Sequence, residues 1–287
     1  MQSTKFFMVG MPGSGKTTYL AMLSNMLVDG GKDVKLSKKV EEMPEGYEYF
    51  SKFGKQLLEC KELDRTQSLV YNNLRIVLYD VLGNEYLLDV PDISGEVFRD
   101  LVKDRRITQE IVDRIGESDC LLFFINYKNM SWERRIPLRK ENSDKKNIDV
   151  KKKEIEDLNL TDKREANQSE IVELLQTLLD LKLSRPYIRF VLSAWDKVET
   201  EEGKDILPSK FVETKFPLLY QFVETNSKYF KAEYWGVSAQ GGDFQNPEDV
   251  KRIEEEEYNA IKVIEPTGKR SSDLTALLYL GIVSNGI

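Results

Sequence analysis

The residues best placed to do chemistry lie close to the N-terminus, in the glycine-rich segment 10–18. Residues 10–17 match the pattern G-x-x-x-x-G-K-[ST] in full. Glycines at these positions let successive backbone N–H groups turn toward one phosphate, and the helix that follows directs its positive end to the same place. The lysine of the pattern reaches the terminal phosphates, and the hydroxyl group after it binds Mg²⁺. The nucleotide-binding residues predicted from this segment are Gly10, Gly13, Ser14, Gly15, Lys16, Thr17 and Thr18.

A second group of candidate residues, Asp92, Gly95 and Glu96, follows an apolar strand further along the chain. The D-x-x-G pattern is weak alone, but it gains meaning downstream of a phosphate-binding loop. The carboxylate of Asp92 would contact Mg²⁺ through water, and the backbone of Gly95 would approach the terminal phosphate. We therefore predict that both patterns serve one nucleotide.

The composition of the chain limits the chemistry that it can perform. The 287 residues include no histidine, which excludes the usual general base and the Ser-His-Asp arrangement. The two cysteines, Cys60 and Cys120, are expected to be buried thiols rather than a disulfide or a metal pair. A net charge of −7 gives no support for general nucleic-acid binding. No apolar run is long enough to span a membrane and no signal peptide is recognisable, so we expect a cytoplasmic location.

Apolar runs alternate with amphipathic stretches, which favours strands alternating with helices. Strands are predicted at residues 6–9, 74–80, 85–90, 120–125, 187–192 and 234–237, and helices at 17–28, within 44–63, at 97–117 (as one or two), and at 170–183, 211–223 and 273–283. This order predicts the α/β class with a three-layer P-loop NTPase fold. The sheet is expected to be mostly parallel, with one antiparallel edge strand and helices on both faces.

We interpret residues 1–287 as a single domain with two insertions. The first, at about 32–68, is an inserted helical segment. The second, at about 128–167, is rich in charge and poor in apolar residues. It is either a partner-binding arm or a solvated loop.

Taken in order, four motifs resemble those of the Ras-like, translation-factor-related P-loop GTPases. The first motif of that class is matched at residues 10–17 and the third at 92–95; the fourth, [NT]-K-x-D, is matched in part at 193–196, and the fifth at 238–240. The similarity covers nearly the whole chain and implies a Ras-like G domain. The long insertions and the altered fourth motif look more like the divergent bacterial GTPase-like domains of conflict and defence loci than like a housekeeping GTPase.

The resemblance implies a guanine site at Asp196, Ser238 and Ala239. A carboxylate such as Asp196 accepts hydrogen bonds from both N1–H and the 2-amino group of guanine, whereas adenine offers neither donor in that arrangement. The backbone N–H of Ala239 would meet the guanine O6. A guanine nucleotide, GTP or GDP, is therefore the expected ligand.

The fourth motif departs from the family pattern at Ser193 and Ala194, which stand where the family has Asn and Lys. Losing that lysine removes aliphatic packing over the base and contacts back to the phosphate loop. Trp195 is expected either to compensate by stacking on the base or to lie in the core.

Two further departures concern catalysis and metal binding. Glu96 stands where efficient relatives often carry the Gln that orients the attacking water, so slow intrinsic hydrolysis is expected. Arg65, or alternatively Arg105 and Arg106, is a candidate arginine finger in cis, and Thr66 is a candidate switch threonine over Mg²⁺. The predicted catalytic residues are thus Lys16, Arg65, Gly95 and Glu96, and the predicted Mg²⁺ ligands are Thr17, Thr66 and Asp92.

The function that these features favour is a Mg²⁺-dependent GTPase switch that acts on a protein effector or regulator. A P-loop ATPase or small-molecule kinase is the alternative enzyme class, with residues 103–106 or 134–135 supplying arginines. A catalytically weak nucleotide-binding scaffold is the third reading, and Glu96 and the altered fourth motif favour it.

Overall fold

An eight-stranded sheet forms the centre of the protein, in the order β2-β3-β1-β4-β5-β6-β7-β8. The computed structural model describes residues 3–29, 34–39, 47–61, 72–92, 95–127, 168–181 and 186–280. The strands are β1 Ser3–Val9, β2 Asn72–Tyr79, β3 Glu85–Asp92, β4 Cys120–Asn126, β5 Tyr187–Ser193, β6 Lys231–Ser238, β7 Lys262–Ile264 and β8 Arg270–Ser271. β3, β1, β4, β5 and β6 are parallel, while β2, β7 and β8 each pair antiparallel with their neighbours.

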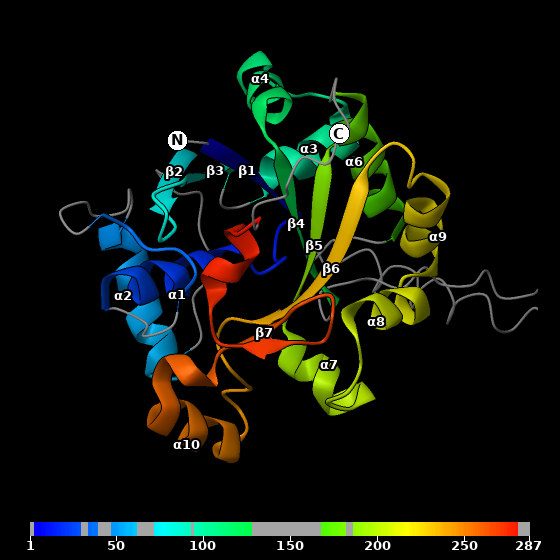
Figure 1. Ribbon diagram of the computed structural model, residues 1–287. Helices are drawn as coiled ribbons and strands as arrows, with labels where there is room; N and C mark the ends of the chain where they lie inside the picture. Colours follow the sequence, from blue (N-terminus) through cyan, green and yellow to red (C-terminus); the bar gives the residue numbers. More distant parts are fainter. Residues whose placement is uncertain are drawn as a thin grey trace, which may run out of the picture.

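Helices cover both faces of this sheet, which confirms the predicted three-layer arrangement (Figure 1). The helices are α1 Lys16–Asp29, α2 Tyr47–Leu58, α3 Glu96–Asp104, α4 Gln109–Glu117, α6 Gln168–Asp180, α7 Trp195–Glu202, α8 Pro208–Lys215, α9 Pro217–Thr225 and α10 Pro247–Glu256, with two 3₁₀ helices, η3 Glu257–Ala260 and η4 Leu274–Leu278. α1, α2 and η4 pack on one face, and α3, α4, α6, α7, α8 and α9 pack on the other.

The central strands carry apolar side chains on both faces, as strands between two helical layers require. In β1, Phe6 and Met8 join the core under α1, while Phe7 and Val9 join the core under α3. β4 is buried from Cys120 to Ile125. Because both faces are apolar, the polar residues that follow these strands gather at the carboxyl edge of the sheet.

Two predicted helices were wrong in extent. The helix predicted at 211–223 is two helices, because α8 ends at Lys215 and α9 begins at Pro217, whose ring has no N–H to donate. The helix predicted at 273–283 is, within the described residues, only the short 3₁₀ helix η4. The strands β7 and β8 were not predicted.

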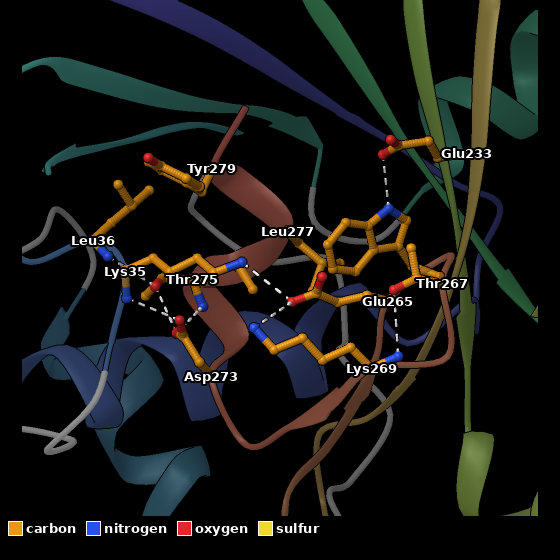
Figure 2. Close-up of polar contacts among 12 residues, drawn as sticks. Lys35, Leu36, Glu233, Glu265, Thr267, Lys269, Asp273, Thr275, Leu277 and Tyr279 are labelled. Atoms are coloured by element: carbon orange, nitrogen blue, oxygen red, sulfur yellow. Dashed lines mark hydrogen bonds and ion pairs between the residues drawn. The ribbon is translucent and has the colours of Figure 1, made fainter. Parts of the chain in front are cut away.

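Two side chains bind the backbone around η4: Asp273, which directly precedes it, and Arg189 on β5. Asp273 accepts hydrogen bonds from the backbone N–H groups of Lys35 and Thr275, at 2.9 and 2.8 Å (Figure 2). The buried guanidinium of Arg189 donates to the carbonyl of Leu277 at 2.7 Å. A carbonyl engaged by a side chain in this way does not need the N–H that an α-helix would supply.

The antiparallel edge strand β2 is confirmed, and β7 and β8 add antiparallel strands at the opposite edge. The helix expected within 44–63 is α2, and the region 97–117 forms two helices. Cys120 is a buried free thiol as expected, whereas the free thiol of Cys60 is partly exposed. The charged insertion at 128–167 lies outside the described residues.

Candidate functional site

The phosphate loop connects β1 to α1 and encloses the side chain of Lys16. Gly13 and Gly15 adopt φ angles of +74° and +96°, which L side chains rarely adopt. Nζ of Lys16 donates to the carbonyl oxygens of Gly10 at 2.6 Å and Met11 at 3.1 Å. The residue is only 2% exposed. The loop therefore holds an ammonium group at the N-terminus of α1, where anions bind best.

Gly95 brings the D-x-x-G motif directly against this loop. Its φ is +82°, and a Cβ added there would lie 2.5 Å from the carbonyl oxygen of Gly10 and 2.6 Å from Nζ of Lys16. Only glycine permits this approach. Asp92 is the last residue of β3, which runs parallel to β1. The phosphate loop and the D-x-x-G motif are far apart in sequence, but they meet at the carboxyl ends of β1 and β3.

Glu96 begins α3 immediately after Gly95, and its side chain is exposed. It forms an ion pair with Arg99 one turn later, at 3.7 Å. Both groups lie on the surface of α3, next to the residue that touches the phosphate loop.

A cavity lies beyond the phosphate loop, between the carboxyl ends of β5 and β6. Its wall is formed by Gly15, Thr18, Tyr19, Phe124, Asn126, Ser193, Ala194, Asp196, Lys197, Val237, Ser238, Ala239 and Gln240. All three residues that the resemblance assigned to the base, Asp196, Ser238 and Ala239, are among them. Ser238 Oγ donates to Oδ1 of Asp196 at 2.6 Å, and both residues are buried. This bond fixes the carboxylate at the cavity wall.

Ser193 links this cavity, called the base cavity from here on, to the phosphate loop. Its hydroxyl donates to the carbonyl of Ser14 at 2.8 Å. A Cβ on Gly15 would lie 2.7 Å from the same hydroxyl, so the loop can approach β5 only because Gly15 has no side chain. The sequence led us to expect that a contact to the phosphate loop is lost with the family lysine. The hydroxyl of Ser193 provides such a contact instead.

Trp195 lies in the core, and the stacking interpretation was wrong. The side chain is fully buried and packs edge-on against Phe211 at a ring distance of 5.6 Å. A Cβ on Gly236 would lie 2.3 Å from the indole ring, so β6 passes directly under it. Trp195 thus anchors α7 rather than contacting a ligand.

α7 is also fixed by an ion cluster at its second turn. The buried carboxylate of Glu199 accepts hydrogen bonds from Lys262 at 2.8 Å and Arg270 at 2.5 Å, on β7 and β8. Burial alone raises the pKa of Glu199, but the two cations more than offset it, and the pKa lies below its ordinary value. The unpredicted strands therefore hold in place the helix that carries Asp196.

Several cavity residues were missed by sequence reasoning. Tyr19 and Phe124 form one wall, with ring centroids 5.2 Å apart. Asn126, at the end of β4, donates to the carbonyl of Gly13 at 3.2 Å. The position of Asn126 directly after a buried parallel strand was a usable signal. Lys197 has no pattern that distinguishes it from other surface lysines.

The family model Double-GTPase 1 matches residues 7–280 of the chain. That span includes the phosphate loop, the D-x-x-G motif and the base cavity. The chain belongs to the Double-GTPase 1 family. This membership confirms the expected relation to GTPases.

Solved structures that resemble this Double-GTPase 1 family member include a bacterial selenocysteine-specific elongation factor, EF-Sec, at 12% identity and a TM-score of 0.39. That match covers 90% of this chain but only 30% of the elongation factor. A signal recognition particle receptor SRb-GTP/SRX complex from Chaetomium thermophilum matches at 12% identity, with coverage of 83% and 92% and a TM-score of 0.39. The Arl6 BBS3 small GTPase from Trypanosoma brucei matches at 11% identity, with coverage of 88% and 96% and a TM-score of 0.33. No curated protein sequence matches this chain.

Thr17 and Asp92, two of the predicted Mg²⁺ ligands, would hold the ion jointly with a nucleotide. Thr17 is the second residue of α1, and Asp92 ends the neighbouring β3. Within the described residues, no group of three or more His, Cys, Asp or Glu could hold a metal alone. An ion here would need phosphate oxygens in its shell, as Mg²⁺ usually does. Arg65 and Thr66 lie outside the described residues. No described helix is long and apolar enough to cross a membrane.

Proposed function

We propose that this family member is a Mg²⁺-dependent GTPase that alternates between GTP-bound and GDP-bound states. The observation that carries the proposal is the pairing of two sites along one sheet edge. Gly95 and Lys16 meet at the phosphate end, and Asp196 and Ser238 meet at the base end. The cavity wall runs from Gly15 and Thr18 to Asp196, so one nucleotide reaches both ends.

Guanine selection rests on the buried carboxylate of Asp196. Ser238 occupies one position on Oδ1 and fixes the orientation of the group. The carboxylate then accepts hydrogen bonds from the base N1–H and 2-amino groups, and Ala239 offers a backbone N–H to O6. Adenine would leave the buried carboxylate without its donors, which costs about 1–3 kcal/mol for each unpaired group.

The phosphates are held by backbone N–H groups of residues 13–18, by Lys16, and by Mg²⁺ on Thr17 and Asp92. The metal supplies charge neutralisation between the terminal phosphates when it is bound. Lys16 would exchange its present carbonyl partners for phosphate oxygens, which are stronger acceptors.

Slow intrinsic hydrolysis follows from Glu96. A carboxylate next to the γ-phosphate is repelled by it and does not orient a water as an amide does. In the structure Glu96 instead pairs with Arg99 on the surface. Faster hydrolysis would need an arginine, supplied by a partner protein or by Arg65. The proposal therefore includes a protein effector or regulator, in a bacterial defence or regulatory system.

The switch is assigned to the contact between Gly95 and the phosphate loop. Because Gly95 sits at the start of α3, a γ-phosphate that binds its N–H would pull on the first turn of that helix. Loss of the γ-phosphate would release this turn. The surface at the start of α3 would then differ between the GTP-bound and GDP-bound states, and a partner protein could distinguish them.

Two measurements test the proposal. A thermal-shift panel with the four nucleoside triphosphates and Mg²⁺ should show the largest stabilisation by GTP; stabilisation by ATP alone would favour an ATPase or small-molecule kinase. Hydrogen exchange should then show different protection of residues 95–104 in the GTP-analogue and GDP states. Equal protection would remove the switch, and tight retention of nucleotide without turnover would favour a scaffold.

A further inference from the structure

Two bonds bridge α7 to β6 and to the loop that follows it, beside the base cavity. The inner bridge is the buried bond from Ser238 to Asp196. The outer bridge is an ion pair between Nζ of Lys197, the residue after Asp196, and the carboxylate of Asp243. Lys197 also forms part of the cavity wall. The side chains of this outer pair are 29% and 38% exposed, whereas Ser238 and Asp196 are buried, so the outer bridge is the more exposed of the two.

The loop that carries Asp243 is held firmly by its own surroundings. The backbone N–H of Asp243 donates to Asp249 at 3.0 Å, and Arg252 donates to the carbonyl of Gly241 at 2.9 Å. Both partners lie on α10. The carboxylate of Asp243 also accepts the N–H of Gln245 at 3.0 Å. Asp243 is thus presented to Lys197 in a fixed position rather than on a free loop.

The side chain of Lys197 has two parts that act differently. Its ammonium hydrogen-bonds Asp243, and this bond is the main reason that the pKa of Asp243 lies below its ordinary value. The residue belongs to the cavity wall together with Ala194, which stands where the family lysine is missing. Long charged side chains commonly pack their stems on apolar groups while the charge stays in a polar environment.

Resting on the proposed function, we propose that the Lys197–Asp243 pair is a clasp across the mouth of the base cavity that slows release of the guanine nucleotide. The stem of Lys197 packs on the bound base, and the ion pair holds that stem in place. Ser193 and Lys197 then share the two roles that the resemblance assigns to the lysine of the fourth motif, contact with the phosphate loop and packing over the base.

The clasp is tested by the dissociation rate of a fluorescent GDP analogue, chased with excess GDP. Lys197→Met keeps the stem and removes the charge, and Asp243→Asn removes the opposite charge. Each should speed dissociation about two- to fivefold, which corresponds to the free energy that a partly exposed ion pair contributes. Because each breaks the same bond, the double variant should match either single variant rather than multiply their effects. Lys197→Ala also removes the stem and should reach about tenfold or more.

A matched control is Lys210→Met on α8, which breaks the exposed Lys210–Glu213 pair at 2.9 Å; neither residue belongs to the cavity wall. Its dissociation rate should equal that of the unmodified protein. In addition, 1 M salt should speed release more from the unmodified protein than from Lys197→Met, because salt screens the ion pair as well as the contacts to the phosphates.

Unchanged dissociation in both Lys197→Met and Asp243→Asn, or effects that multiply in the double variant, would overturn the clasp. Far-UV circular dichroism confirms that each variant is folded. Failure of the unmodified protein to bind any guanine nucleotide would instead contradict the proposed function itself, so the two failures are distinguishable.

Discussion

The site has a phosphate end, at the loop around Lys16, and a base end, at Asp196 and Ser238. Both ends lie along the same edge of the sheet, but backbone groups form the first and side chains form the second. At the phosphate end, backbone geometry dominates: Gly13, Gly15 and Gly95 adopt positive φ angles and let main-chain groups converge on Lys16. At the base end, side chains dominate, as in the bond from Ser238 to Asp196. Backbone geometry tolerates few substitutions, whereas a side-chain role can pass to a neighbouring residue. This difference explains why the first motif is complete and the fourth is altered.

The largest effect is expected at the phosphate end. Lys16→Ala removes the ammonium that neutralises the terminal phosphates, and two charge-assisted hydrogen bonds of about 1.5–3 kcal/mol each disappear with it. GTP affinity, measured by calorimetry with Mg²⁺, should fall by about 1000-fold. Lys210→Ala, on the surface of α8, should bind normally. Retained affinity in Lys16→Ala would show that the loop does not hold the phosphates.

Asp196→Asn should change which base is bound rather than abolish binding. The amide can donate a hydrogen bond where the carboxylate only accepts, so GTP should weaken about 100-fold and xanthosine triphosphate should gain affinity. The exposed Asp205→Asn serves as the control. Equal loss for both nucleotides would mean that Asp196 supports the fold but does not read the base.

Gly95→Ala should separate GTP from GDP. The new methyl group would meet the Gly10 carbonyl and Lys16 at about 2.5 Å and force Gly95 away from the phosphate loop. GTP affinity should fall about tenfold while GDP affinity stays the same, because strain of this kind costs about 1–3 kcal/mol. Gly116→Ala on α4 is the matched control, since a Cβ there meets nothing within 4 Å. A parallel fall for both nucleotides would place Gly95 away from the γ-phosphate.

The smallest effect is expected at Ser193, which joins the two ends. Ser193→Ala removes the 2.8 Å bond to the carbonyl of Ser14. GTP and GDP should both weaken about fivefold, the value of one neutral hydrogen bond. Ser209→Ala on α8 controls for the loss of a hydroxyl. A selective loss of one nucleotide would contradict the role of Ser193 as a general link to the loop.

The parts of the fold that were predictable are those with strong local signals. The glycine pattern at 10–17 and the uniformly apolar run at 120–125 each specify one structure, and both were confirmed. β7 and β8 contain three and two residues, too few to show a period-2 pattern. The extent of η4 could not be predicted because its carbonyls bind Arg189, a residue far away in sequence.

The base end was predictable only in part, for the same reason. Asp196, Ser238 and Ala239 lie at or just after the ends of strands and match two known motifs, and the structure places all three at one cavity. The contact from Ser193 to Ser14 and the pairing of Lys197 with Asp243 depend on how β5, β6 and their loops pack. Trp195 shows the converse: an aromatic residue beside a motif belongs to the core.

The central claim is that one nucleotide spans both ends, with its phosphates on the loop at Lys16 and a guanine at Asp196. Calorimetry of the full chain with GTP, GDP and ATP, each with Mg²⁺, tests it most directly. We expect micromolar or tighter binding of GTP and GDP, and ATP binding weaker by about 100-fold. Equal affinity for ATP, or no heat with any purine nucleotide, would contradict the account.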